Sequence, residues 1–102
     1  MGGAAVSRKL LVAVKQFEVE CGVLMARSQA KQLTKGFGGA QAVMLDFSGV
    51  TMIGQAFADE VFRVFKGKHP EVEIVPFHVS HEVKQMISQA TIVGSEGVGD
   101  GS

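Results

Sequence analysis

The segment Met44–Gly67, MLDFSGVTMIGQAFADEVFRVFKG, decides the fold. It begins inside an almost continuous apolar run at 42–47, which is typical of a strand buried on both faces. Ser48 and Gly49 form a turn signal, and a helix is predicted from Gly54 to about Lys66. At about 100° per residue, six apolar residues of this helix fall on one arc, namely Phe57, Ala58, Val61, Phe62, Val64 and Phe65. The segment therefore predicts a strand, a turn and an amphipathic helix.

The opposite side of this helix carries Asp59, Glu60, Arg63 and Lys66, which are predicted to form a solvated face. An exposed ion pair three or four residues apart contributes only ~0.2–0.5 kcal/mol. Burial of one phenylalanine contributes ~1.5–3 kcal/mol. The aromatic face, rather than the charges, is therefore expected to anchor the helix.

Upstream of this segment, the apolar run at 9–17 predicts a strand. Apolar and acidic residues alternate within 15–22, which predicts a second, half-exposed strand, and 23–26 is long enough for a further short strand. Ser28 is then expected to cap a helix that ends at the glycines after 35.

Downstream, 71–79 predicts a strand that contains Pro76. Proline has no N–H to donate to a ladder, so this strand is expected at a sheet edge or bend. Ser80 is placed to cap a last helix, whose apolar stripe is Val83, Met86, Ile87 and Ala90.

These elements predict one α/β domain at 9–93, with a mixed sheet of about four to five strands and about three helices packed on it. Residues 1–8 are expected to be a flexible N-terminus. Residues 94–102 contain too few apolar side chains to order themselves and are expected to be a disordered tail.

Composition narrows the classes of function. The chain has 102 residues, 46% of them apolar, with ten basic and ten acidic side chains. A balanced charge argues against binding to nucleic acid or to anionic lipid, because both need a basic face. One cysteine excludes an internal disulfide framework, and neither a signal peptide nor a membrane-spanning run is seen. A cytoplasmic location is the expectation.

Two clusters and a single cysteine are candidate sites of chemistry. Asp46 with Asp59 and Glu60 can be a carboxylate pair, but an Asp46 bonded to turn amides is favoured, because no activated nucleophile accompanies the carboxylates. His78, His81 and Glu82 lack a third metal ligand at the expected spacing. Nothing local lowers the pKa of the Cys21 thiol, so a small apolar role is favoured for it. The expectation is a protein that is not an enzyme and holds neither metal nor cofactor.

The polar segment Gly54-Gln55-Ala56 stands apart from these clusters. It lies where a strand hands over to a helix, and ligands of open α/β sheets collect at such places. Helix N-terminal amides there can receive an anion or a side chain of a partner. A generic loop remains equally open.

The strand–turn–helix sequence LDFSGVTMIGQAFADEVFRVF resembles STAS domains, the fold of sulphate-transporter tails and anti-sigma-factor antagonists. More closely, it resembles the STAS-like domain family of unknown function, whose members have a similar GQAFADE helix start. The resemblance extends over 22–90, through ARSQAKQLTKGF, HPEVEIVPF and the V-x-x-M-I helix. In antagonist STAS domains, a kinase phosphorylates a hydroxyl at this helix start. The corresponding residue is Gln55, which has no hydroxyl, so the resemblance implies the fold without that switch.

The resemblance implies a regulatory module that binds a protein partner, such as a kinase-like ATPase or a transcription regulator. The expected binding residues are Gly54, Gln55, Asp59, Glu60 and Arg63. The alternative is a sensor that binds a nucleotide or another anion at the loops of 49–56. Homo-oligomers are left open.

Overall fold

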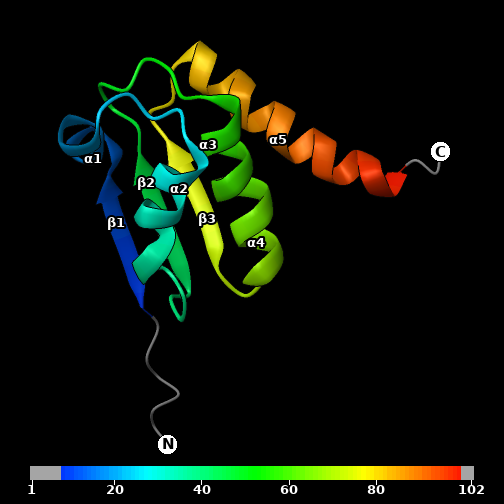
Figure 1. Ribbon diagram of the computed structural model, residues 1–102. Helices are drawn as coiled ribbons and strands as arrows, with labels where there is room; N and C mark the ends of the chain where they lie inside the picture. Colours follow the sequence, from blue (N-terminus) through cyan, green and yellow to red (C-terminus); the bar gives the residue numbers. More distant parts are fainter. Residues whose placement is uncertain (1–7, 100–102) are drawn as a thin grey trace, which may run out of the picture.

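The computed structural model describes the backbone of residues 8–99 and the side chains of residues 8–91. Three parallel strands form one sheet in the order β1-β2-β3 (Figure 1). The strands are β1 (Lys9–Ala13), β2 (Ala42–Asp46) and β3 (Glu73–Phe77). The helical elements are α1 (Val14–Cys21), α2 (Arg27–Leu33), the 3-10 turn η2 (Thr34–Gly36), α3 (Gln55–Asp59), the π-helical turn η3 (Glu60–Val64), α4 (Phe65–Lys68) and α5 (His81–Gly99).

The α/β class is confirmed, but the predicted mixed sheet of four to five strands is wrong, because the described residues form three strands that are all parallel. The segment predicted as a second strand is α1. Its inward residues, Val14 and Phe17, are three apart, as on one face of a helix. Val19 and Cys21 are both exposed, so the apolar role expected for Cys21 is also wrong.

The helices α2 and α3–α4 lie on the same side of the sheet and contact each other (Figure 1). Strand crossovers are almost always right-handed. Because the three strands follow one another in chain order, both crossovers advance in the same direction and bring their helices to the same face. The core lies between this face and the helices, and alternate strand residues point into it: Leu10, Val12, Val43, Leu45 and Ile74.

The prediction of a helix with an apolar face over 54–66 is confirmed. Phe57, Ala58 and Val61 are fully buried, and Phe62 and Phe65 nearly so. The helix begins after Gly54 and, as α3, η3 and α4 in succession, reaches Lys68. Glu60 does not lie on a solvated face as predicted, because it is 5% exposed. It begins the π-helical turn, whose i→i+5 hydrogen bonds change the angular spacing of the side chains.

The C-terminal elements also follow their sequence signals. β3 contains Pro76 and is an edge strand, as predicted. The backbone N–H of Val83 donates to Ser80 Oγ over 3.1 Å, which confirms the predicted cap of α5. The backbone of α5 continues into the predicted tail as far as Gly99. Residues 1–7 and 100–102, the rest of the predicted flexible ends, lie outside the described residues. None of the described helices is both long and apolar enough to cross a bilayer.

Candidate functional site

The N-terminal end of α3 lies against the loop that leads into α2. The backbone N–H of Gly54 donates to the carbonyl oxygen of Leu24 over 2.7 Å. A Cβ atom at Gly54 would lie 2.8 Å from the Cα of Met25, closer than real Cβ contacts come. Gly54 is therefore the residue that lets the loop approach the start of α3.

One glutamine side chain holds the other side of this loop. Gln29 Oε1 accepts hydrogen bonds from the backbone N–H groups of Met25 (2.9 Å) and Ala26 (2.8 Å). Its Nε2 donates to the carbonyl oxygen of Val23 over 3.1 Å. The helix begins at Arg27, so the prediction that Ser28 caps it is wrong. This arrangement fixes Arg27 at the first position of α2, facing α3.

Arg27 joins an ion network with carboxylates of α3 and η3. Its Nη1 donates to Asp59 Oδ2 over 2.9 Å and to Glu60 Oε1 over 3.1 Å. Arg63 Nη2 donates to the same Asp59 oxygen over 2.8 Å, and Arg63 Nε donates to the other. The Arg63 hydrogen bonds, and after them the Arg27 hydrogen bond, lower the pKa of Asp59 to about 2. The two arginines and two carboxylates together carry no net charge.

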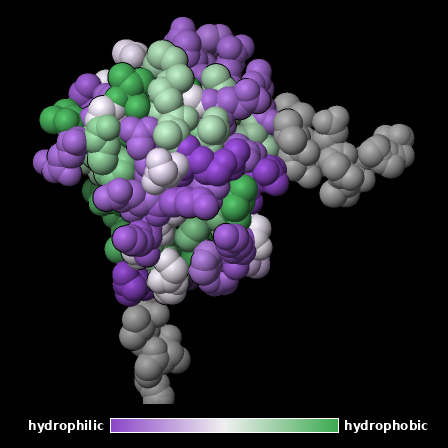
Figure 2. All heavy atoms as spheres, viewed as in Figure 1, coloured by the Kyte–Doolittle hydropathy of each residue, from purple (hydrophilic) through white to green (hydrophobic). Residues whose placement is uncertain are grey.

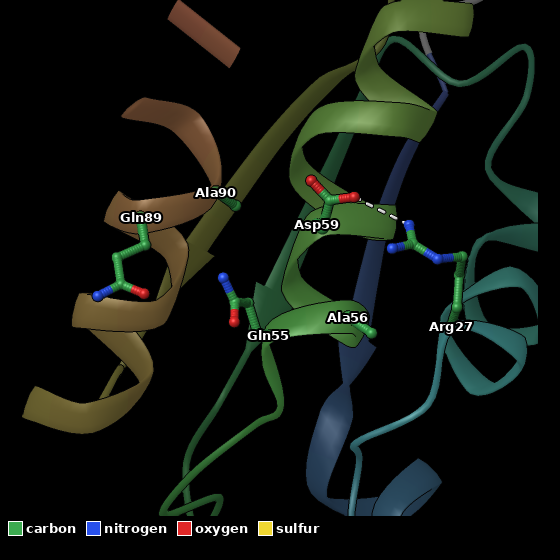
Figure 3. Close-up of a pocket in the computed structure, with 6 residues that line it drawn as sticks. All are labelled: Arg27, Gln55, Ala56, Asp59, Gln89 and Ala90. Carbon is green, nitrogen blue, oxygen red and sulfur yellow. Dashed lines mark hydrogen bonds and ion pairs between the residues drawn. The ribbon is translucent and has the colours of Figure 1, made fainter. Parts of the chain in front are cut away.

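A hollow of about 320 Å³ adjoins this network at the start of α3. Figure 3 shows Gln55 at the first turn of α3 and Gln89 on the facing side of α5, with Arg27 reaching in from the side of α2. The hollow is lined by Arg27, Gln55, Ala56, Asp59, Gln89 and Ala90. Among the side chains of residues 8–91, neither Gln55 nor Gln89 has a hydrogen-bond partner within the protein. Each amide can donate a hydrogen bond to a ligand and accept one from it.

Three exposed apolar side chains lie in the two loops that meet at Gly54, at the start of α3. Val23, Met25 and Met52 are 57%, 47% and 44% exposed. Met25 contacts Gly54, and Met52 lies two residues before it. We call these three residues the apolar rim. On the side of the molecule drawn in Figure 2, apolar side chains lie toward the end where the loops that follow the strands are found. Polar side chains lie across the middle.

The five site residues predicted from the sequence differ in their accessibility in the structure. Gln55, Asp59 and Arg63 lie together on the accessible side of the helix. Gly54 is buried beneath Met25 and offers no side chain. Glu60 points to Arg27 rather than to solvent.

Sequence reasoning missed Arg27, Gln89 and the apolar rim. Arg27 and Asp59 are 32 residues apart in the sequence, so no local sequence pattern indicates that they form an ion pair. The rim also lacks a signal, because its members look like ordinary core residues in the sequence. The loop before α2 contacts the start of α3 at Gly54, and this contact between distant segments is visible only in the folded structure.

Asp46 is hydrogen-bonded to the turn that follows its strand, as predicted. Asp46 Oδ1 accepts hydrogen bonds from Ser48 N (2.9 Å) and Ser48 Oγ (2.7 Å), and His78 Nδ1 lies 3.1 Å away. The Ser48 hydroxyl is the main group that lowers the pKa of Asp46, followed by the Ser48 amide and His78. Among the residues that the structure describes, no three His, Cys, Asp or Glu side chains are grouped so as to hold a metal ion.

Comparison with models of known protein families gives a match. The family described as "STAS-like domain of unknown function (DUF4325)" matches residues 28–84, which include Asp59, Glu60 and Arg63 of the ion network and the start of α5; Arg27 lies one residue before the match. Searches of curated proteins and of solved structures return no match. The matched segment is more than half of the chain, and it contains the strand–turn–helix unit that determines the fold. The chain therefore belongs to the STAS-like domain family of unknown function.

Proposed function

We propose that this domain is a non-enzymatic regulatory module that binds a protein partner at the N-terminal end of α3. The apolar rim is the observation that carries the proposal. Val23, Met25 and Met52 together expose large apolar side chains around one helix start. Large apolar side chains that are exposed near polar groups, in loops that meet at one place, are a feature of interaction sites.

The chemistry around the rim also favours a protein. Methionine has a flexible, polarisable side chain that adapts to the shape of a partner. Methionine and arginine are enriched in interfaces, and both occur here, as Met25 and Met52 beside Arg27 and Arg63. The amides of Gln55 and Gln89 can bond the N–H and C=O groups of a polypeptide backbone.

The expected partner is a kinase-like ATPase or a transcription regulator, as the resemblance to antagonist STAS domains implies. Binding here does not depend on phosphorylation at the start of α3. Gln55 is the first residue of that helix, and it has no hydroxyl to accept a phosphate.

A second candidate is a sensor for a nucleotide or another anion. It is favoured by the size of the hollow, about 320 Å³, which falls within the usual range of small-ligand sites. Thermal-shift measurements against nucleotides and inorganic phosphate test it. A ligand present at 100 times its dissociation constant adds ~2.7 kcal/mol of stability.

Affinity capture from the native lysate tests the protein-partner proposal. The test variant is Met52→Asp, and the matched control is Val19→Asp, which introduces the same charge at an exposed apolar residue of α1. A further variant combines Gln55→Glu with Arg63→Glu. We expect the wild type and Val19→Asp to recover the same protein, and the other two variants to lose it. Equal recovery by all four proteins would remove this surface as the interface.

A further inference from the structure

The second face of the sheet is not covered by the helices of its two crossovers. Both crossovers bring their helices to one face, and α5 packs on α3 and η3. Parallel sheets are normally covered on both faces. Here Leu11 in β1 is 71% exposed and Met44, in the central strand β2, is 36% exposed.

The residues of this open face form rows across the sheet. Leu11 pairs with Met44, and Met44 pairs with Val75, so three apolar side chains lie side by side. The row toward the amino ends of the strands contains Lys9 and Glu73, each paired with Ala42. A basic residue thus lies on one edge strand and an acidic residue on the other, with an apolar middle between and beside them.

We propose that a second copy of this chain covers the open face, related to the first by a twofold axis parallel to the strands. This axis places β1 of one copy over β3 of the other and β2 over β2. Leu11 then lies over Val75 of the other copy, and the two Met44 side chains meet on the axis. Lys9 of each copy lies over Glu73 of the other, which gives two complementary pairs. A twofold interface must be complementary to itself in this way.

The charged residues favour this axis over a twofold axis that is perpendicular to the strands. A twofold axis perpendicular to the strands would set Lys9 over Ala13, and Glu73 over Phe77, leaving both charges against apolar groups. With the axis parallel to the strands, Asp46 is the one charged residue of these rows that lies over its own copy. Its carboxylate is turned back toward its own loop by the hydrogen bonds from Ser48.

The size of the face sets the strength of the dimer. Three strands about 4.8 Å apart, with about 3.3 Å per residue along five-residue strands, span roughly 14 by 16 Å. Such a face is much smaller than a standard interface, so the dimer is expected to be weak and to form only at high protein concentration.

Sedimentation equilibrium of the full chain from 1 to 500 µM tests the proposal. The wild type should shift from monomer to dimer across this range. Leu11→Asp should abolish the shift, whereas Val19→Asp should keep it, although both replaced side chains are 71% exposed. A wild type that stays monomeric, or a dimer that survives Leu11→Asp, would overturn the proposal.

Charge reversal tests the orientation. In a dimer of Lys9→Glu a carboxylate faces a carboxylate at both places, and in a dimer of Glu73→Lys an ammonium group faces an ammonium group at both places, so each variant should dimerise more weakly than the wild type, by roughly tenfold or more. A mixture of the two variants should dimerise again, because each mixed dimer pairs opposite charges at both places. Failure of the mixture to associate would overturn the proposed axis. Circular dichroism of each variant verifies that the monomers remain folded.

Discussion

Replacing Gly54 by alanine is expected to destabilise the domain, against the usual effect of this substitution. The backbone at Gly54 has φ −84° and ψ 161°, which alanine adopts freely. Alanine at such a position normally stabilises a protein by ~0.4–1 kcal/mol, because the unfolded chain loses freedom. Packing against Met25 reverses the sign here.

The distances set the magnitude. The new Cβ would lie 2.8 Å from Met25 Cα and 2.9 Å from Met25 O, so the loop must retreat by about 0.6 Å to reach an ordinary contact. Overpacking of this kind costs ~1–3 kcal/mol. The retreat also strains the 2.7 Å hydrogen bond from Gly54 to Leu24. After subtraction of the entropic gain, we expect a loss of about 1–2 kcal/mol.

Gly67→Ala is the matched control. Gly67 lies inside α4, and a Cβ there would meet nothing within 4 Å. Alanine is favoured over glycine in a helix by ~0.5–1 kcal/mol. Thermal and urea unfolding of both variants should therefore give opposite shifts, with the midpoint temperature of Gly54→Ala lower by roughly 5–10 °C for a domain of this size.

A Gly54→Ala protein as stable as the wild type, or more stable, would refute this reasoning. It would mean that the loop at Met25 yields without cost, and that the start of α3 is not held by close contact with it.

The ion network gives two further predictions. Arg27→Met should lower the urea midpoint more than Arg63→Met, because it leaves the carboxylate of Glu60, 5% exposed, without its partner; equal shifts would contradict the assignment. The folded pKa of Asp59, about 2, lies below its unfolded value of about 3.9, so its contribution to stability is complete above about pH 5 and is lost as the pH falls toward 2. Asp59→Asn should therefore destabilise the protein at pH 6 by about 1–2 kcal/mol and have little effect near pH 2, and a pH-independent difference would argue against this pKa.

The sequence predicted best where burial follows a regular period. The aromatic face of 55–65 and the cap at Ser80 depend on local spacing, and both were found as predicted. The segment 15–22 failed because its short alternation suits a strand, while the inward residues Val14 and Phe17 follow a helical spacing. An eight-residue segment is too short for the pattern to decide between the two.

The site was less predictable than the fold, because distant contacts build it. Gln55 was predicted from its place at a strand–helix junction, and Asp59 and Arg63 were predicted from the polar face of the helix. Arg27 joins them across 32 residues. The burial of Glu60 depends on a π-helical turn that a fixed helical angle does not foresee. Met25 lies in a loop that packs against Gly54, and hydropathy alone does not indicate that Met25 and Met52 are exposed.

Photo-crosslinking in living cells tests the central claim, that the apolar rim binds a protein partner, most directly. A benzophenone amino acid would replace Met52 in one protein and Lys35, an exposed residue of η2, in another. We predict a discrete covalent adduct from position 52 that is absent from position 35 and is lost when Gln55→Glu and Arg63→Glu are added. No adduct at position 52, or the same adduct from both positions, would contradict the account.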